Sequence, residues 1–397
     1  MSEEKLVPKL RFSGFDDEWK SFKLSEISKR ITRKNKSLET DRPLTISAQY
    51  GLVDQIEYFN KIVASKSLKG YYLLNKGEFA YNKSYSNGYP FGAVKRLDDY
   101  ENGAISTLYI CFNTNDKMNS DLLKEYFETD KWHEEIYKIA VEGARNHGLL
   151  NVAVGDFFNT KHVLPTNNHE QEKIAKFLIE INTKIDLLEN KHKAYQDFKK
   201  YLMQKIFAQE LRFNFNDAWK TVKIKDIFDE RSEKGFLDLE LLSVTLNDGV
   251  IKRSEIESKD NSNENKSNYK HVLPGDIVYN SMRMWQGASG VSPYEGIVSP
   301  AYTILIPKNV YSKYFGYYFK TNEMVYQFKK YSQGLTSDTW NLKYPLISEI
   351  KIKIPSIEEQ KEITNVFEIM DEKIKILQNN IDELTTFKKG LLQQMFV

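Results

Sequence analysis

The feature that most constrains the fold of this chain is an internal duplication. The segment FKKYLMQKIF at 198–207 returns as FKKGLLQQMF at 387–396. Two further pairs of segments extend the match: LPTNNHEQEKI (164–174) with IPSIEEQKEI (354–363), and LRFSGFDDEWKSFKLSEI (10–27) with LRFNFNDAWKTVKIKDIF (211–228). A repeat on this scale means that one structural unit is built twice. The order is A–B–A′–B′, in which the two A units differ and the two B segments agree closely.

Each B segment predicts one long helix. Apolar residues recur every seven residues from Ile174 and from Ile363, with a second row four residues further on. This is the stripe of a helix that packs against another helix. His192 and Lys199 fall on the first stripe, so we expect looser packing near the middle of that helix. At about 38 residues and 1.5 Å per residue, each helix is roughly 57 Å long.

The B helices need a partner for this stripe. We expect them to pair with each other, antiparallel and within one chain; pairing with another chain is the alternative. Pro165 and Pro355 end the strand before each helix. The spacing of a capping box follows in both copies, as Asn168 with Gln171 and as Ser356 with Glu359.

The A units read as mixed α/β. Short strands are expected in GEFAYN, STLYICF, GDIVYN and AYTILIP, and one helix is expected near the end of each unit, in DLLKEYFETDKWHEEIYKIA and in YSKYFGYYFKTNEMVYQFKKY. The predicted fold therefore has two α/β domains separated by two long antiparallel coiled-coil helices, with a pseudo-two-fold internal repeat. Its predicted parts are 1–165 (first domain), 166–210 (central helix), 211–355 (second domain) and 356–397 (C-terminal helix).

Composition narrows the class of protein. A chain of 397 residues with 41% hydrophobic and 13% aromatic residues is expected to fold, and into more than one core. No apolar run is long enough to span a bilayer, and MSEEKLVPKL lacks the apolar region of a signal peptide. Cys111 is the single cysteine, which excludes an internal disulfide and a multi-cysteine metal site. We expect a cytoplasmic protein.

Loops in both A units have the residue types that read duplex DNA. The net charge of +2 gives no general attraction to phosphate, so any such binding depends on local patches. The loops at 82–96 and 280–290 are both basic, free of acidic residues and rich in amides and aromatics. Arginine and lysine can grip guanine edges, asparagine and glutamine can pair with adenine, and hydroxyls can hold phosphates. A single lysine is ordinarily a solvated surface group; the argument rests on the two equivalent loops together.

The candidate DNA-binding residues come from these two loops, from the basic segment 29–36, and from the segments 142–148 and 332–341, which follow the late helices. They are Lys29, Arg30, Arg33, Lys34, Lys83, Ser84, Tyr85, Asn87, Lys95, Arg96, Arg145, Asn146, His147, Ser281, Arg283, Trp285, Gln286, Gln333, Thr336, Ser337, Thr339 and Asn341. No residue is a candidate for catalysis or for binding a metal.

Catalytic motifs are missing. No GxG pair occurs, so loops that bind a dinucleotide or a methyl donor lack their glycines, and GARNHG is followed by Leu149 where a Walker A loop has lysine. The chain has no PP dipeptide, and HEQEK at His169 and HEEIY at His133 lack the second histidine of a zinc protease. Glu349 and Lys351 imitate the end of a nuclease motif without its upstream aspartate. The chain is predicted to be non-catalytic.

The whole pattern resembles the specificity subunit of type I restriction–modification systems. The resemblance covers essentially the whole chain and rests on LRF…W, on the IPSIEEQKEI start and FKKGLLQQMF end of the helices, and on the A–B–A′–B′ order. It implies two target-recognition domains, each reading one half of a bipartite, asymmetric sequence in double-stranded DNA. It also implies that the paired helices act as a spacer and dock two methyltransferase subunits.

The resemblance places the chemistry on other subunits. The methyltransferases hold S-adenosylmethionine and methylate adenine at N6, and restriction subunits, which are motors and nucleases, join through the methyltransferase core with ATP and Mg. This chain is then expected to carry no cofactor and to contact no membrane. The alternative from another class is a coiled-coil scaffold that binds only protein. A self-sufficient methyltransferase is disfavoured by the missing glycines.

Overall fold

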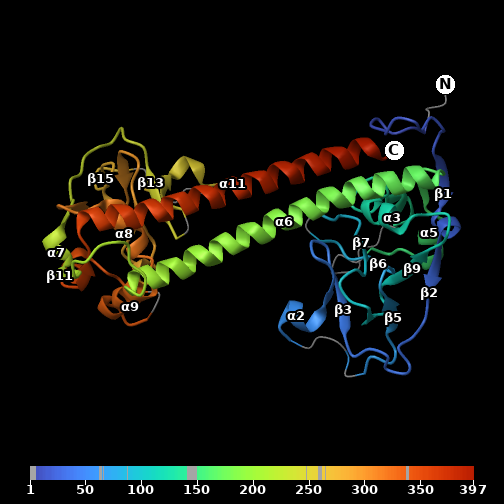
Figure 1. Ribbon diagram of the computed structural model, residues 1–397, viewed down its shortest axis with the longest axis horizontal. Helices are drawn as coiled ribbons and strands as arrows, with labels where there is room; N and C mark the ends of the chain where they lie inside the picture. Colours follow the sequence, from blue (N-terminus) through green and yellow to red (C-terminus); the bar gives the residue numbers. More distant parts are fainter. Residues whose placement is uncertain are drawn as a thin grey trace. The chain divides into compact units, whose positions relative to one another are not determined.

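The computed structural model describes residues 6–61, 65, 67–86, 88–140, 150–246, 248–257, 262–263, 265–336 and 339–397. The chain divides into two compact units (Figure 1). Unit 1 is formed by Met1–Glu189 with Asn379–Val397, and unit 2 by Asn190–Gln378. Each unit therefore contains one A segment of the sequence repeat together with one end of each long helix.

Unit 1 contains ten strands and five short helices among its described residues, besides its share of the long helices. The strands are β1 (Lys20–Lys23), β2 (Ser28–Ile31), β3 (Pro43–Ser47), β4 (Gly51–Asp54), β5 (Tyr72–Asn75), β6 (Phe79–Asn82), β7 (Ala93–Arg96), β8 (Asn102–Ile105), β9 (Ile110–Thr114) and β10 (Lys161–Leu164). The helices are α1 (Leu24–Ile27), α2 (Gln55–Phe59), α3 (Ser120–Tyr126), α4 (His133–Ile139) and α5 (Val154–Asn159).

Unit 2 repeats most of this order. Its strands are β11 (Lys220–Lys223), β12 (Phe228–Glu230), β13 (Leu242–Thr245), β14 (Gly249–Lys252), β15 (Lys270–Val272), β16 (Ile277–Asn280), β17 (Ser289–Val291), β18 (Gly296–Val298), β19 (Tyr302–Pro307) and β20 (Lys351–Ile354). Its helices are α7 (Ile224–Ile227), α8 (Ser312–Tyr318), α9 (Asn322–Tyr331), α10 (Tyr344–Ile347) and the 3-10 turns η1 (Arg253–Glu255) and η2 (Met284–Gln286).

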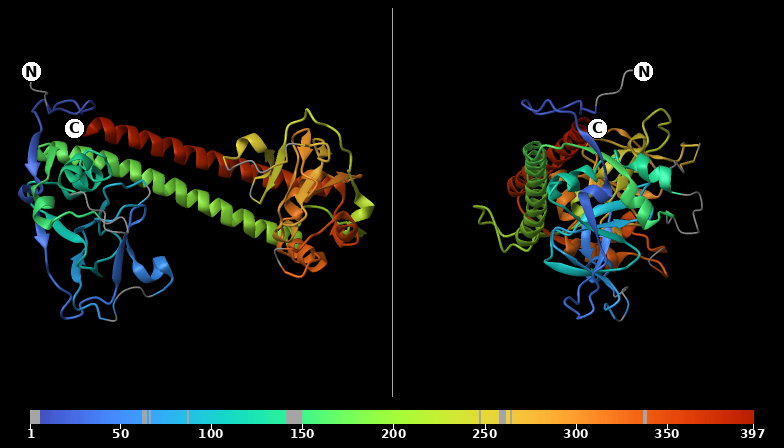
Figure 2. Two further views of the ribbon diagram at one scale, coloured as in Figure 1. Left: turned by 180° about the vertical axis from the view of Figure 1, so that it is seen from behind. Right: turned by 90° about the vertical axis from the view of Figure 1, so that its right-hand side faces the viewer.

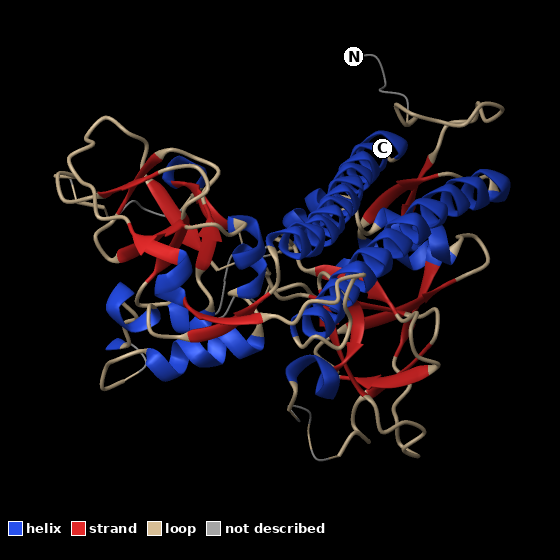
Figure 3. Cartoon of the chain, turned by 60° about the vertical axis from the view of Figure 1, so that its left-hand side comes forward, coloured by secondary structure: helices blue, strands red, loops and turns tan. Residues whose placement is uncertain are grey.

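The sheets of the two units correspond. In unit 1 a four-stranded sheet has the order β2-β9-β6-β7, and in unit 2 the order β12-β19-β16-β17. A two-stranded antiparallel ribbon joins the first and last strands of each domain, β1 with β10 and β11 with β20. The second sheets differ: unit 1 has β4-β3-β8-β5, whereas unit 2 has the separate pairs β13-β14 and β15-β18. The mixed α/β class predicted from the sequence is confirmed, and strands and helices intermix in both units (Figure 3).

The two B segments form the long helices α6 (Asn168–Phe207) and α11 (Ile357–Met395). In unit 1 the start of α6 and the end of α11 share one core, in which Ile174 and Leu178 lie with Leu391. In unit 2 the end of α6 and the start of α11 share another core, with Ile206 and Phe367. The helices are thus paired antiparallel within the chain, as predicted. Among the described residues, no helix has an apolar stretch that could cross a membrane.

One polar anchor fixes the α/β domain of each unit to a helix start. The carboxylate of Glu170 accepts hydrogen bonds from Arg11 Nε at 2.6 Å, from Arg11 Nη2 at 2.9 Å and from Trp19 Nε1 at 3.3 Å. In unit 2 the same contacts join Glu359 to its partners Arg212 and Trp219. The repeated LRF…W and EQ segments, far apart in the chain, therefore meet in one contact.

The glutamine of each EQ pair completes the anchor. Gln171 donates to Pro165 O at 2.8 Å and accepts from Asn119 N at 2.8 Å. Gln360 makes the equivalent bonds with Pro355 O and Tyr311 N. Because these side chains are buried, they hold the last strand and the late helices of each domain against the helix start.

The ends of the chain meet within unit 1. Leu10 N donates to Gln394 O at 2.9 Å, and the N-terminal segment lies beside the end of α11 in both views of Figure 2. In unit 2 the end of α6 continues into the corresponding LRF segment through Leu211. The same junction is therefore covalent in unit 2 and non-covalent in unit 1.

Two local predictions were wrong. The single late helix of each A unit is two helices, α3 and α4 in unit 1, and α8 and α9 in unit 2. The break comes where Thr129 and Thr321 turn their hydroxyls back to a carbonyl three residues earlier. The start of α6 is capped by Asn167, whose Oδ1 accepts from His169 N and Glu170 N, and not by Asn168. Ser356 does cap α11, as predicted, by accepting from Glu359 N.

Unit 1 contains a buried histidine that should make its stability depend on pH. His162 is held between Tyr126, whose hydroxyl lies 3.0 Å from Nδ1, and Thr160, whose hydroxyl lies 2.8 Å from Nε2. Since the Thr160 hydroxyl donates to Phe157 O, its oxygen accepts from Nε2–H, and Nδ1 accepts from the tyrosine. Both bonds suit the neutral ring, and burial lowers the pKa of His162 to about 4.

Acid is therefore expected to destabilise unit 1. The unfolded histidine takes up a proton near pH 6.5, whereas folded His162 resists it until about pH 4, so stability is lost as the pH falls through this interval. The loss at pH 5 should be about 2 kcal/mol relative to pH 7.5. Denaturant unfolding of the full chain at both pH values, compared with His162→Gln, measures it. If the His162→Gln variant lost as much stability in acid, His162 would not be the cause of the pH dependence. The equivalent position in unit 2 is Ile352, which cannot titrate.

Candidate nucleic-acid interface

The predicted loops of unit 2 are brought together at the end of β16. Leu342 N donates to Ser281 O at 2.8 Å, which ties the segment 332–341 to the loop 280–290. Across this contact the rings of Trp285 and Trp340 meet edge to face, with centroids 5.3 Å apart. We call residues 280–290 and 332–341 the unit 2 loop pair.

The backbone of the unit 2 loop pair is well fixed. Arg283 O accepts from Gln286 N at 2.9 Å, and Arg283 N donates to Asn280 O at 2.9 Å. Gly287 has a φ of +85° and closes the η2 turn against α9, where a Cβ would lie 3.3 Å from Val325. Gln333 and Asn341 bond each other through their backbones. A rigid loop of this kind positions its exposed side chains at little entropic cost on binding.

Arg283 is the exposed cation of this loop pair. Most other described arginines are held by acids: Arg11 by Glu170, Arg33 by Glu78, Arg42 by Asp54, Arg96 by Asp98 and Asp121, Arg212 by Glu359, and Arg231 by Asp276. Within the described part of the chain, the guanidinium groups of Arg283 and Arg30 have no hydrogen-bond or ion-pair partner. An unpaired planar guanidinium group on a hydrogen-bonded loop is available to bind a ligand.

Other predicted residues surround Arg283. Gln286 and Gln333 are exposed, and the hydroxyls of Thr336 and Thr339 bond within their own turn. Asn341 Oδ1 is buried and lacks a partner among the described atoms. Ser281 is less available, because its hydroxyl is buried and donates to Ala301 O.

The prediction omitted Trp340 from this loop pair. Its ring packs on Trp285, and the Lys329 ammonium lies 5.6 Å from its centroid. An aromatic residue directly before the predicted Asn341 was the signal in the sequence. Leu335 was also omitted; it is fully exposed at the tip of the loop.

Unit 1 has the equivalent arrangement. Leu150 N donates to Lys83 O at 2.9 Å, which joins the loop after β6 to the chain that follows residue 149. The loop is backed by α4, where Phe91 packs on His133 with ring centroids 5.1 Å apart. Tyr85 is exposed, and Lys83 Nζ lies 3.4 Å from Val152 O. The loop 82–92 therefore presents Lys83, Ser84 and Tyr85 from one short stretch.

Two predicted residues of this loop belong to strand β7 and are neutralised by acids from elsewhere. Lys95 is 9% exposed and pairs with Glu128 at 2.6 Å. Arg96 pairs with Asp98 at 2.6 Å and with Asp121 at 2.8 Å. The prediction treated the stretch as free of acids because it contains none. The acids come from other segments: Asp98 from the turn after β7, Asp121 from α3 and Glu128 from the residues after α3. These two cations are therefore poor candidates for DNA contacts.

The basic segment 29–36 is also partly occupied. Arg33 bonds Glu78 at 2.7 Å and Leu73 O at 3.1 Å, and Lys34 donates to Gly70 O at 2.9 Å. Lys29 and Arg30 are exposed on β2, where successive side chains point to opposite faces. One flat surface can therefore engage only one of the two directly. Asn87, Arg145, Asn146, His147 and Ser337 lie outside the described residues.

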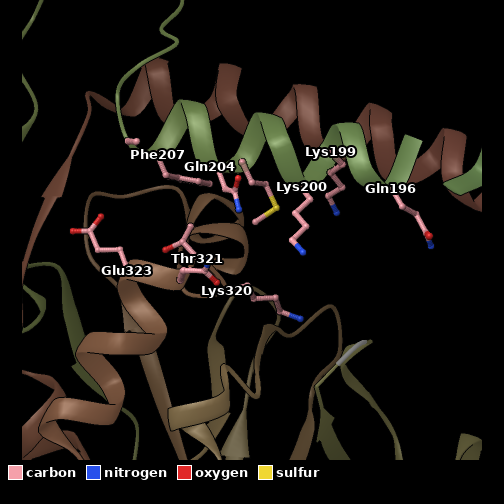
Figure 4. Close-up of a pocket in the computed structure, with 11 residues that line it drawn as sticks. Gln196, Lys199, Lys200, Gln204, Phe207, Lys320, Thr321 and Glu323 are labelled. Carbon is pink, nitrogen blue, oxygen red and sulfur yellow. The ribbon is translucent and has the colours of Figure 1, made fainter. Parts of the chain in front are cut away.

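A separate cavity of about 350 Å³ lies in unit 2, at the end of α6 (Figure 4). Lys199, Lys200 and Phe207 line it from α6, and Lys320 and Thr321 line it from the connection between α8 and α9. Burial lowers the pKa of Lys320. None of the predicted DNA-binding residues lines this cavity, so it is distinct from the loop pair.

The described residues contain no group of three or more histidine, cysteine, aspartate or glutamate side chains placed to hold a metal ion. Cys111 is buried, and burial raises the pKa of its thiol to about 12. The prediction named no catalytic or metal-binding residue.

Comparison with known proteins shows which proteins the chain is similar to. A family model described as the type I restriction modification DNA specificity domain matches residues 216–386. The type I restriction enzyme MjaVIII specificity subunit of Methanocaldococcus jannaschii is 23% identical over 95% of this chain and 91% of its own length. Over nearly its whole length the chain is therefore similar to a specificity subunit of a type I restriction–modification system.

Solved structures of this class share the fold. The S subunit of a type I system from M. genitalium matches with a TM-score of 0.58 and 15% identity, over 99% of both chains. A chain from a structure on complex assembly and conformational transition of the type I system matches with a TM-score of 0.55, over 95% of this chain and 97% of that one, at 15% identity. As a specificity subunit, the chain is a non-catalytic DNA-recognition component, as predicted.

Proposed function

We propose that the chain reads a bipartite, asymmetric target in double-stranded DNA. Residues 1–165 would read one half and residues 211–355 the other, as two target-recognition domains. The observation that carries the proposal is the equivalent pairing of loops, through Lys83 O with Leu150 N and through Ser281 O with Leu342 N. It gathers the half-buried Lys83 and the exposed Tyr85 in unit 1, and the exposed Arg283 and Gln286 with the tryptophan pair in unit 2, at the end of a central strand of the four-stranded sheet.

Unlike loops imply unlike half-sites. The unit 1 loop presents Lys83 and Tyr85, whereas the unit 2 loop pair presents Arg283, Gln286 and the tryptophan pair. Lysine is a point charge that suits phosphate, whereas arginine and glutamine can form paired bonds with guanine and adenine edges. Two such readers favour a non-palindromic sequence. A scaffold that binds only protein has no need of a free arginine on a fixed loop.

The long helices are proposed to set the distance between the half-sites and to dock two methyltransferase subunits. Each helix passes from one unit to the other without a break. S-adenosylmethionine, ATP and Mg would be bound by the methyltransferase and by the motor and nuclease subunits that join it. The complex would act in the cytoplasm.

The test is to co-express the chain with its methyltransferase partner and to map methylated adenines across the host genome. We expect one bipartite motif with two different halves and a fixed spacer. Methylation that requires this chain but follows no motif would contradict the reading role. Sedimentation of the complex with and without duplex separates this outcome from the scaffold alternative.

The spacer should change when the helices are lengthened. Four residues inserted after Glu189 and four after Gln378, which are equivalent positions in the two helices, add about 6 Å. At roughly 3.4 Å per base pair, the motif should gain one or two base pairs of spacer while both half-sites stay the same. The control is the same four residues inserted in the exposed loop near Asn265. If the DNA spacer stayed the same when the helices are lengthened, the helices would not set the distance between the half-sites.

A further inference from the structure

The cavity at the end of α6 is built twice. In unit 2 it has a volume of about 350 Å³ and lies between α6 and the connection from α8 to α9 (Figure 4). A cavity of about 330 Å³ lies in unit 1, between the last turns of α11 and the connection from α3 to α4. The helix residues that line the two cavities match in the repeat: Lys200 with Lys389, Met203 with Leu392, and Gln204 with Gln393. Each cavity is therefore a reference for the other.

The charges around the unit 1 cavity balance. Glu128, from the connection between the helices, pairs with Lys95 at 2.6 Å. Asp130 and Lys389 add one negative and one positive charge to the wall. Burial lowers the pKa of His133, which is therefore neutral near pH 7. The described lining residues of this cavity thus have no excess charge of either sign.

The unit 2 cavity has an excess of positive charge. Lys320 stands where the connection in unit 1 has its glutamate. The ammonium groups of Lys199, Lys200 and Lys320 therefore lie around one space (Figure 4). Among the described residues, Lys199 is the one of the three with a carboxylate partner, which is Asp371. Lys320 donates to Leu246 O at 3.0 Å, a neutral acceptor, so two positive charges are left without an acid.

These lysines repel one another. Burial, and after it the positive charge of Lys199, lower the pKa of Lys320. Glu323 supplies the one carboxylate among the described lining residues, and Figure 4 shows it on the side away from the three ammonium groups. A covered charge without a partner is unfavourable, so an anion placed between the lysines would be bound with a net gain in free energy.

The rest of the wall is apolar. Met203, Phe207 and Ala208 line the cavity from α6, beside the lysines. A volume of about 350 Å³ is at the lower end of the range for small-molecule sites and suits a compact body such as one benzene ring. The two unpaired ammonium groups match a phosphate monoester, which has a charge of about −1.5 to −2 at pH 7.

We propose that the unit 2 cavity binds a small phosphate monoester with a compact apolar body. The three lysines hold the phosphate, and the apolar wall holds the body. The unit 1 cavity, whose charges balance, does not bind the same compound. This difference favours a small molecule over an anchor for the methyltransferase, because two copies of one subunit would need the same anchor in both units. Since the ligand contacts both α6 and the connection from α8 to α9, its binding stabilises unit 2.

The test titrates phenyl phosphate into the full chain, and into its complex with the methyltransferase partner, by isothermal titration calorimetry at pH 7.5. We expect one site per chain, with a Kd below about 1 mM. Inorganic phosphate lacks the apolar body and benzyl alcohol lacks the charge, so each should bind at least about tenfold more weakly. If inorganic phosphate bound as tightly as phenyl phosphate, the apolar wall would take no part and the proposal would be wrong.

Variants decide whether these lysines hold the probe. Lys200→Ala and Lys320→Met should each weaken binding by about 10- to 100-fold, the loss expected for one charged hydrogen bond. Lys200→Arg keeps the charge and should stay within about threefold of the parent. Lys389→Ala removes the equivalent lysine of unit 1 and should leave the affinity unchanged.

Two results would overturn the proposal. Equal affinity for phenyl phosphate in the parent, Lys200→Ala and Lys320→Met chains would place the probe elsewhere on the protein. Binding by the free chain that is lost in the complex would show that the methyltransferase covers the cavity, which would then belong to that subunit and not to a small ligand.

Discussion

Replacing Glu170 with glutamine is expected to lower the free energy of unfolding of unit 1 by about 3–5 kcal/mol. The Glu170 side chain is 2% exposed and, among the described residues, its carboxylate is the one that pairs with the largely covered guanidinium of Arg11. Glutamine keeps the size of the side chain but directs an amide N–H₂ at a donor, which leaves the arginine charge covered and unpaired. Denaturant unfolding, followed by the fluorescence of Trp19, reports the change.

The control for this variant lies two residues away in the same turn of α6. Glu172 is exposed, and its contact with His169 is a surface pair. Glu172→Gln should change the stability by less than about 0.5 kcal/mol. Glu359→Gln should act on unit 2 in the same direction, since it removes the partner of Arg212 and Trp219. A loss below about 1 kcal/mol for Glu170→Gln would show that the anchor is not a principal contact.

These anchors explain why the sequence repeat predicted the fold so well. The segments that match between the two halves are the ones that meet in space: Arg11 and Trp19 come from LRF…W, Glu170 from the EQ pair, and Phe396, whose ring centroid lies 6.2 Å from that of Trp19, from the end of α11. A contact made of three distant segments keeps all three alike in both copies. Self-similarity within one chain therefore located the joints between domain and helix, although it could not say which residue touches which.

The details that the sequence missed depend on contacts between distant residues. Lys95 and Arg96 stand in an acid-free stretch, yet Glu128 and Asp121 reach them from segments more than 20 residues away. The split of each late helix depends on a threonine hydroxyl that competes for a carbonyl, which helical periodicity does not reveal. His192 and Lys199, which break the apolar stripe in the sequence, are both half-buried, and Lys199 pairs with Asp371 of α11.

The sequence predicted which residue types form the candidate interface, but not which of its cations are left unpaired. Composition selected both loops, and the structure brings each next to the segment after the late helices. Composition alone could not show that Arg33 and Arg96 are paired with acids while Arg283 is not, because pairing depends on the folded chain. Because a cation must be unpaired to bind DNA, Arg283 is the most informative residue to mutate.

If unit 2 reads a half-site as proposed, replacing Arg283 with lysine is expected to relax one guanine position in that half-site. The planar guanidinium can bond both O6 and N7 of guanine, whereas an ammonium makes a single point contact. Loss of the paired contact should reduce discrimination at that base by about 10- to 100-fold, which corresponds to 1–3 kcal/mol. Maps of methylated adenine from the co-expressed complex, with competition between duplexes that differ at one base, measure it.

Lysine is the informative substitution because it retains the charge. If Arg283 contacted phosphate, Arg283→Lys would preserve both the motif and the salt dependence of binding, and Arg283→Ala would weaken all sequences equally. If it reads a base, both variants broaden the same position, and only alanine also lowers the salt slope. Lys375→Ala, an exposed cation on α11, should leave the motif unchanged. If both Arg283 variants kept the unit 2 half-site intact, the base would have to be read by Gln286 or its neighbours. The half-site of unit 1 serves as the internal reference in every case.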